Sequence, residues 1–304
     1  MTRRVLVLGA TGMLGHALVR ELSVDPGLDV YGAARSMEGR AHLFPPDLLA
    51  RITPALDVSR FDQVRQILDD LRPDVVVNCV GVIKQRPDVQ DAVATVRLNA
   101  LFPHLLADAC AQLGSRLVHV STDCVFSGER GGYRESDRPD PPDLYGRSKL
   151  LGETTTAPAL TLRTSIIGHE LTTNRSLLDW FLSQQGRVGG FTRAIYSGVT
   201  TVEFARLLRA VVLPREDLTG LYHLAAEPIS KYDLLQLVAD VYGWRGELRP
   251  NVDFVLDRSL HADALAQATG YRPPAWPDMI RLMHDARARW STPEALVGRH
   301  STPV

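Results

Sequence analysis

Tyr145 and Lys149 are the residues of this sequence whose types and spacing most clearly suggest chemistry. On a helix, residues four positions apart lie on the same face, so the phenol and the ammonium would be neighbours. A nearby ammonium favours the phenolate, and we expect it to lower the pKa of the tyrosine. Tyr145 could then exchange a proton with a carbonyl or alcohol oxygen while hydride moves at the adjacent carbon.

A second polar group lies upstream, where an apolar segment ends in Ser121-Thr122-Asp123. A hydroxyl at the end of such a strand could hold the substrate oxygen beside Tyr145. Adjacent strand residues point to opposite faces, so only one of Ser121 and Thr122 is expected to serve. Tyrosine and lysine at this spacing are also common on protein surfaces, and the upstream hydroxyl favours the catalytic interpretation.

A glycine-rich turn near the start of the chain indicates a dinucleotide site. Gly9 and Gly12 would let the main chain turn tightly and approach a pyrophosphate, and Gly15 would let the helix pack close to the strand. The helix N-terminus would offer N–H donors to the phosphates. A strand-to-helix turn without a ligand is the alternative. The positions between the glycines that we assign to the cofactor site are Thr11, Met13 and Leu14.

The end of the second expected strand favours one nicotinamide cofactor over the other. Sites for NAD usually place an acidic residue there, whereas this strand ends in Ala33-Ala34-Arg35-Ser36. Arg35 can pair with a 2′-phosphate, and Ser36 adds a hydrogen-bond donor. The sequence therefore predicts NADP(H), with NAD(H) as the alternative cofactor and a solvated surface arginine as the alternative role of Arg35.

Further cofactor contacts are expected at the ends of the third and fourth strands. Asp57 ends the third strand and Val58 comes after it, and Asp57 could bind the adenine amino group or start the next helix. Asn99 lies within a helical segment that its type disfavours, so it either stabilises a kinked backbone near the site or is exposed. The main chain that should pass close to the cofactor consists of Cys79, Val80 and Gly81.

The elements that must position these residues alternate in the first half of the chain, as in a parallel sheet covered by helices. The expected strands are 4–8, 29–33, 52–56, 74–79, 116–121 and 159–163. The expected helices are 14–22, 60–71, 91–113 and 144–153, followed by 177–183, 202–212 and 232–242 after the alternation loosens.

This order predicts an α/β protein with a Rossmann-type doubly wound parallel sheet and a smaller, mostly C-terminal α/β substrate lobe. We place the dinucleotide-binding domain at 1–165 and the substrate lobe mainly at 166–304. A later segment, about 190–225, is expected to return to the first domain, and the tail after 290 is expected to be mobile.

The composition restricts the partners and the compartment. Lysine and arginine number 34 against 35 acidic residues, which gives no case for nucleic acid or an anionic membrane surface. Three distant cysteines without a CxxC pair predict reduced thiols, and neither a signal segment nor a long apolar run is present. We therefore expect a cytoplasmic protein that acts on a small molecule, and a homodimer is compatible with the sequence.

Several segments together resemble the extended short-chain dehydrogenases/reductases, and most closely their dTDP-4-dehydrorhamnose reductase group. The resemblance rests on VSTDCVFSG (120–128), YRE with Asp137 (133–137), YGRSKLLGE (145–153), LRTS (162–165), GLYHL (220–224) and 271–276. It implies a catalytic triad of Thr122, Tyr145 and Lys149, with Asp123 beside it. It also implies reduction, by NADPH, of the 4-keto group of a nucleotide-activated 6-deoxy sugar for deoxysugar or polysaccharide biosynthesis.

The sequence departs from that group at two places that face the sugar in the family. Typical members carry an aromatic residue where Cys124 stands, and another where this chain has Ile166-Ile167. The departures leave the fold and the hydride chemistry in place and put the identity of the sugar in question. The group's use of a metal is not carried over, because no matching ligand cluster is present, so no metal site is predicted.

Two other functions remain open at this stage. One is a sugar-nucleotide epimerase or dehydratase, although Cys124 after Asp123 replaces the second carboxylate that dehydratases commonly use. The other is an NADP-binding regulatory protein without turnover, because a similar fold serves as the regulatory subunit of methionine adenosyltransferase. Residues that could hold a substrate, or could equally well pack or cap, are Arg163, His169, Asn174, Arg175, Trp180, Lys231 and Arg258.

Overall fold

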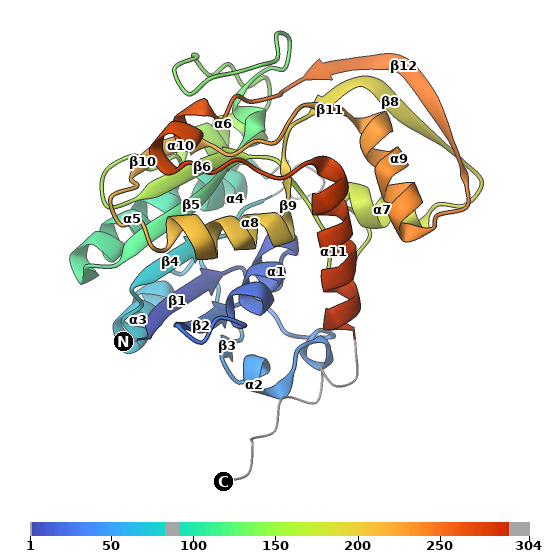
Figure 1. Ribbon diagram of the computed structural model, residues 1–304. Helices are drawn as coiled ribbons and strands as arrows, with labels where there is room; N and C mark the ends of the chain where they lie inside the picture. Colours follow the sequence, from blue (N-terminus) through green and yellow to red (C-terminus); the bar gives the residue numbers. More distant parts are fainter. Residues whose placement is uncertain (1, 83–90, 292–304) are drawn as a thin grey trace.

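The large sheet of the protein has seven parallel strands in the residues that the computed structural model describes, 2–82 and 91–291. Their order is β10-β6-β5-β4-β1-β2-β3 (Figure 1). The strands are β1 (Arg3–Leu8), β2 (Leu28–Ala33), β3 (Ile52–Thr53), β4 (Val75–Asn78), β5 (Arg116–Thr122), β6 (Leu160–Thr164) and β10 (Gly220–His223). The predicted α/β class with a doubly wound parallel sheet is confirmed.

Helices cover both faces of this sheet, which explains why β1 and β4 are almost uninterrupted apolar runs. On one face, Val5 and Val7 pack in a core with α1 (Met13–Leu22) and α8 (Thr201–Leu207). On the other face, Leu6 and Leu8 pack with α3 (Phe61–Leu71) and α5 (Phe102–Leu113). Because the connections leave β1 and β4 toward opposite faces, a crevice forms at the carboxyl ends of these two strands.

The smaller lobe contains a three-stranded sheet, β11-β8-β12, at the upper right of Figure 1. Its strands are β8 (Arg187–Tyr196), β11 (Ile229–Ser230) and β12 (Glu247–Asp257), with α7 (Leu177–Ser183) and α9 (Lys231–Tyr242) packed nearby. A short pair, β7 (Ile166–Ile167) with β9 (Val199–Thr200), joins the lobe to the large sheet, and the last helices of the described residues are α10 (Asp263–Thr269) and α11 (Trp276–Trp290).

The segment of about 190–225 is divided between the two parts of the molecule. Its first residues belong to β8 of the small sheet, whereas α8 packs on α1 and β10 joins the large sheet beside β6. The helix α11 packs against both α8 and α9 and so connects the two parts. Of the tail after 290 that we expect to be mobile, residues 292–304 lie outside the described residues.

Several elements differ from the predicted ones. The single helix expected at 91–113 is α4 (Ala92–Val96), a π-helical turn (Arg97–Leu101) and α5, and the helix expected at 202–212 is α8 followed by a second π-helical turn (Leu208–Val212). The third strand stops at Thr53, so Asp57 follows it rather than ending it. Short elements not predicted are α2 (Pro46–Leu49) and the 3-10 turns Ala41–Leu43 and Asp123–Val125.

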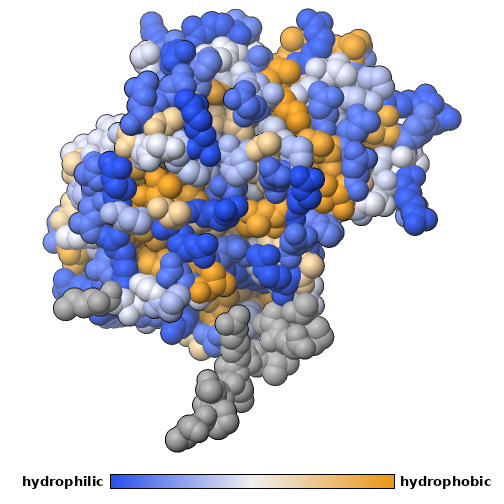
Figure 2. Space-filling model, viewed as in Figure 1, coloured by the Kyte–Doolittle hydropathy of each residue, from blue (hydrophilic) through white to orange (hydrophobic). Residues whose placement is uncertain are grey.

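Hydrophilic side chains cover much of the face seen in Figure 2, with apolar patches between them. Within the described ranges, every helix is too short or too polar to pass through a lipid bilayer.

The first crossover depends on a missing side chain at Gly15. A Cβ built on Gly15 would lie 2.0 Å from the carbonyl oxygen of Gly9, whereas one on Gly12 would lie 3.3 Å from the same atom. We expect Gly15→Ala to lower the free energy of unfolding by about 1–3 kcal/mol, because the helix must move away from the strand. Urea unfolding measures this, with Gly12→Ala as the matched control, and equal midpoints for the two variants would contradict it.

Candidate functional site

Tyr145 and Lys149 lie on α6 (Leu144–Leu151), which begins directly against the end of β5. The carboxylate of Asp143 caps this helix by accepting the N–H of Gly146 at 2.8 Å. Gly146 has no side chain to separate the helix from the strand, since a Cβ there would lie 2.2 Å from the carbonyl oxygen of Cys124. The sequence thus places the first turn of α6 beside the residues that follow β5.

Lys149 is buried, and its Nζ donates a hydrogen bond to the carbonyl oxygen of Val120 at 2.7 Å. Burial lowers the pKa of Lys149 to about 8, and the carboxylate of Glu153 and the thiol of Cys79 oppose this shift. The lysine therefore connects α6 to β5 and also lies near the end of β4, where Cys79 stands.

The hydroxyl of Thr122 lies close enough to that of Tyr145 to affect its titration. Thr122 Oγ1 also donates to Asp123 Oδ1 at 3.1 Å and accepts the N–H of Cys124 at 3.1 Å. Ser121 points to the other face, where its hydroxyl donates to Glu153 at 2.7 Å. Of the two hydroxyls at the strand end, only Thr122 therefore lies beside Tyr145.

The expectation that Lys149 lowers the pKa of Tyr145 is wrong for this structure. Burial raises the pKa of the phenol above its ordinary value, the charges of Cys124 and Asp123 add to the rise, and the hydrogen bond with Thr122 opposes it. Tyr145 consequently holds its proton at neutral pH and is a proton donor in that state.

Asp123 is a buried carboxylate that accepts hydrogen bonds from two neighbouring hydroxyl groups. Besides Thr122, it accepts a hydrogen bond at Oδ2 from the hydroxyl of Ser165 at 2.5 Å. No lysine, arginine or histidine in the described parts of the chain forms an ion pair with it. The carboxylate therefore places an uncompensated negative charge next to Tyr145.

The glycine turn lies in the crevice between β1 and β4, as the sequence predicts. Gly9 has a φ of +85°, and a Cβ there would lie 3.2 Å from the main chain of Cys79. Gly12 is exposed and begins α1 without a side-chain cap. The first N–H groups of this helix are thus directed to the crevice, a geometry suited to a phosphate. Around them, Thr11 and Met13 are half-buried and Leu14 is buried.

Arg35 is exposed just beyond β2, and it is close enough to Asp57 to affect its titration. Asp57 accepts the hydroxyl of Ser59 at 2.7 Å and its N–H at 3.0 Å, and these bonds lower the pKa of the carboxyl, with the charge of Arg35 adding to the effect. Asp57 thus orders the turn before α3. Ser36 Oγ accepts the N–H of Glu38 at 3.1 Å, and Val58 packs partly buried on the adjoining core.

Asn99 is fully buried, so the exposed alternative is wrong, and it lies in the π-helical turn. Its Oδ1 accepts the N–H of Val82 at 2.9 Å, and its Nδ2 donates to the carbonyl of Val82 and to Ser148 Oγ, each at 3.1 Å. Asn99 therefore holds the segment after β4, which contains Cys79, Val80 and Gly81, against α6. A Cβ on Gly152 would lie 1.9 Å from the carbonyl of Asn99, so this packing is close.

Three of the residues suggested for substrate binding are buried and form hydrogen bonds with other residues of the protein. Arg163 makes two hydrogen bonds of 2.7 Å to Glu153, and His169 bonds to Asp179 at 2.7 Å. Arg258 donates to the carbonyl of Phe126 at 2.9 Å and to the sulfur of Cys124 at 3.4 Å, so it borders the site. The others are outside these clusters: Asn174, Arg175 and Trp180 are exposed near α7, and Lys231 starts α9.

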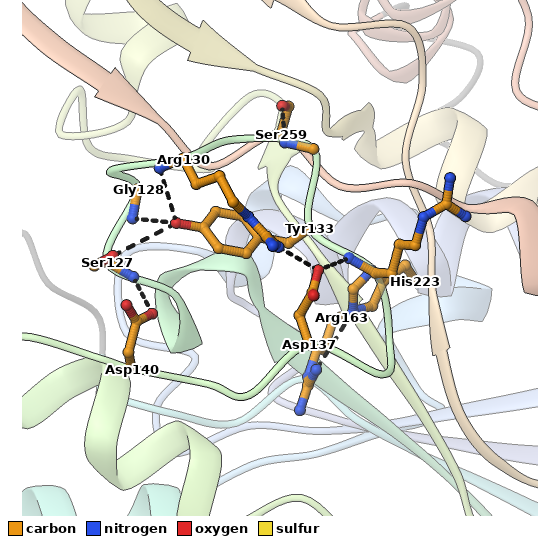
Figure 3. Close-up of polar contacts among 11 residues, drawn as sticks. Ser127, Gly128, Arg130, Tyr133, Asp137, Asp140, Arg163, His223 and Ser259 are labelled. Atoms are coloured by element: carbon orange, nitrogen blue, oxygen red, sulfur yellow. Dashed lines mark hydrogen bonds and ion pairs between the residues drawn. The ribbon is translucent and has the colours of Figure 1, made fainter.

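The loop after β5 is fastened by Tyr133, as Figure 3 shows. The Tyr133 hydroxyl accepts the N–H groups of Gly128 at 3.1 Å and Arg130 at 3.3 Å, and its ring stacks on Phe126 at 4.2 Å. Its main-chain N–H donates to the carbonyl of Ser259 at 2.8 Å. The loop therefore ties the strand end that contains Thr122 to the segment that follows β12.

The described residues contain no group of three or more histidine, cysteine, aspartate or glutamate side chains placed to hold a metal ion. Sequence reasoning missed two polar residues beside the site. Ser165 was noted only as part of a family segment, and Tyr196 ends a strand, β8, that was not predicted.

Comparisons with known proteins give a family and two kinds of relative. The sequence profile of the RmlD substrate binding domain matches residues 3–255. Methionine adenosyltransferase 2 subunit beta of Danio rerio is 31% identical over 258 residues, which cover 79% of this chain and 74% of that protein. A dTDP-4-dehydrorhamnose reductase of Aggregatibacter actinomycetemcomitans is 29% identical over 254 residues, 78% of each chain.

A solved structure shares the fold. The dTDP-4-dehydrorhamnose reductase of Bacillus anthracis, in complex with NADP, superimposes with a TM-score of 0.77 over 94% of this chain and 100% of that one, at 20% identity.

Burial of Lys149 predicts a pH-dependent stability. Between about pH 8 and pH 10.5 the unfolded chain binds a proton at Lys149 that the folded chain does not, so the free energy of unfolding rises with pH across this interval. The full effect is on the order of 3 kcal/mol. We expect Lys149→Met to remove this rise in urea unfolding followed against pH, whereas Lys231→Met, at the start of α9, should retain it. Parallel pH profiles for wild type and Lys149→Met would refute the assignment.

Proposed function

The chain belongs to the RmlD substrate binding domain family, and from this premise we propose that it is an NADPH-dependent oxidoreductase. Its substrate is a nucleotide-activated 6-deoxy sugar, of which it reduces the 4-keto group. The observation that carries the proposal is the placement of Thr122, at the end of β5, beside Tyr145, on the helix that also contains Lys149. Donors so placed can hold a single carbonyl oxygen.

Tyr145, Thr122 and Lys149 have separate roles in the proposed reaction. Bound NADPH supplies a hydride to the keto carbon. Tyr145 donates its phenolic proton to the carbonyl oxygen as that oxygen becomes an alkoxide, and Thr122 orients the oxygen by its hydroxyl. Lys149 keeps α6 against β5 through its hydrogen bond to Val120, and it is near enough to the end of β4 to reach a nicotinamide ribose.

The cofactor site follows from the crevice between β1 and β4. The turn of Gly9 and Gly12 and the open N-terminus of α1 suit the pyrophosphate. Exposed Arg35 at the end of β2 suits a 2′-phosphate, which favours NADPH over NADH and leaves NAD(H) as a weaker alternative. The NADP held by the Bacillus anthracis reductase of the same fold supports this choice.

The second candidate is a regulatory subunit without turnover, which the relationship to methionine adenosyltransferase 2 subunit beta favours. The presence of Thr122 at the end of β5, with Tyr145 and Lys149 on the adjoining α6, favours the enzyme. An epimerase or dehydratase of the same family is less favoured, because Cys124 stands where a second carboxylate would be needed. A homodimer and a cytoplasmic location stay predictions.

The proposed function predicts that Tyr145→Phe abolishes turnover. NADPH oxidation with a dTDP-4-keto-6-deoxy sugar, followed by absorbance, should fall by about 100- to 10,000-fold, because the phenolic proton is lost. Binding of NADPH should stay close to that of the wild type. If wild type binds NADPH tightly and oxidises none with a range of keto sugars, the regulatory function replaces the enzymatic one.

Arg35 is the residue that should set the cofactor preference. Replacing it with aspartate removes a cation for the 2′-phosphate and adds an anion, so we expect the NADPH to NADH ratio of kcat/KM to fall by about 10- to 100-fold. Arg40→Asp, in the same loop, is the matched control for the change in net charge. An unchanged ratio of kcat/KM for NADPH over NADH in Arg35→Asp would contradict the assignment of Arg35 to the 2′-phosphate.

A further inference from the structure

Tyr196 has a phenolic oxygen that is buried and has no hydrogen-bond partner among the described residues. The residue ends β8, and its ring packs at 5.5 Å from that of Trp276. A buried hydroxyl left unpaired costs about 1–3 kcal/mol. Folded proteins rarely retain such a group, and a ligand that completes it is one physical reason to do so.

Gly198 has no side chain, and this allows the phenolic oxygen of Tyr196 to lie close to Ser165. A Cβ on Gly198 would lie 2.6 Å from Tyr196 Oη and 2.1 Å from the carbonyl oxygen of Ser165. The N–H of Val199 donates to that same carbonyl at 3.0 Å. Tyr196 Oη is therefore held beside the backbone of Ser165, whose own hydroxyl bonds to Asp123.

The charge of Asp123 acts on this phenol. Burial raises the pKa of Tyr196 well above its ordinary value, and the negative charge of Asp123 raises it further. The Asp123 carboxylate accepts from Thr122 and Ser165 and has further lone pairs, because an ionised carboxylate offers about four acceptor sites. A donor without an acceptor and an acceptor with spare capacity thus lie close together without bonding to each other.

A group that completes both must accept from the phenol and donate to the carboxylate. A carbonyl or ether oxygen cannot donate, and an ammonium cannot accept, whereas a water molecule or the alcohol of a bound substrate does both. Asp123 also bonds to Thr122, which itself contacts Tyr145. The alcohol would therefore lie next to the oxygen on which Tyr145 acts.

We propose that Tyr196 and Asp123 together bind the substrate hydroxyl on the carbon adjacent to the reacting carbonyl. This inference rests on the proposed function and makes it more specific. In a 4-keto-6-deoxy sugar that hydroxyl is the one on C3, because C5 bears the ring oxygen and the methyl carbon. Tyr196 is then a residue that determines specificity, and it takes no part in proton transfer.

The test compares Tyr196→Phe with wild type on two substrates, a dTDP-4-keto-6-deoxy sugar with a 3-hydroxyl and its 3-deoxy counterpart. Wild type should prefer the 3-hydroxyl substrate. The variant should lose about 10- to 100-fold in kcat/KM on that substrate and change little on the 3-deoxy one, since it cannot donate to the missing oxygen. Equal losses on both substrates, or no loss on either, overturn the inference.

A structural role for the phenol would give a different result. Tyr196→Phe removes an oxygen without a partner, so the Tm of the ligand-free protein should be unchanged or higher. Tyr31→Phe is the matched control, because its phenol bonds to Asp29 at 2.9 Å on β2, away from the site, and it should leave both substrates unaffected. A marked fall in Tm for Tyr196→Phe would contradict the absence of a partner and with it the inference.

Binding of a product separates this inference from the proposed function. With NADP⁺ present, the shift in Tm caused by dTDP-6-deoxyhexoses with and without the 3-hydroxyl needs no turnover. One outcome is that wild type reduces no keto sugar and is still stabilised by the 3-hydroxyl sugar, while Tyr196→Phe is not stabilised by it. That result contradicts the proposed function and supports the inference. If neither turnover nor a hydroxyl-dependent shift occurs in wild type, both are overturned.

Discussion

The contact between α6 and the end of β5 is the constraint on which the site depends. Gly146 allows the helix to touch the main chain of Cys124, and Lys149 bonds to the carbonyl of Val120 from the following turn. These two contacts fix both the distance and the rotation of the helix. Tyr145 directly precedes Gly146 on the helix, so the close approach of Gly146 to the residues after β5 also brings the phenol of Tyr145 near Thr122.

The surrounding network holds this contact from two sides. Asn99 connects the segment after β4 to Ser148, the neighbour of Lys149 on α6. Glu153 follows the same helix and accepts hydrogen bonds from Ser121 and from Arg163 on β6. Breaking such a buried ion pair by removing one partner leaves an uncompensated charge, which is far more destabilising than losing a surface pair. The network thereby fixes α6 against the ends of β4, β5 and β6.

The sequence was sufficient for the large sheet, because buried parallel strands and amphipathic helices differ clearly in pattern. The spacing also predicts where Thr122, Tyr145 and the glycine turn lie in the fold, while their roles stay predictions, and the matched family profile confirms the resemblance to the extended short-chain dehydrogenases/reductases. The sequence failed for β12, an exposed strand that contains Pro250 and has a register shift between Asn251 and Val255, because its pairing with β8 depends on distant residues. Tyr196 was missed for the same reason, since its place beside Asp123 is set by packing alone.

Burial acts on Tyr145 and Lys149 in the same sense, because it disfavours charge on both. A site of this kind holds a neutral phenol, which suits reduction: the proton passes to an alkoxide, and an alkoxide is more basic than a phenolate. Oxidation of an alcohol would instead need the phenolate, whose formation burial and the charge of Asp123 both oppose. In the reaction that we propose, the same charge would also oppose an oxyanion beside it, so the proton would have to arrive as the hydride is transferred. Tyr145, whose phenol lies near Thr122, is the donor in that proposal.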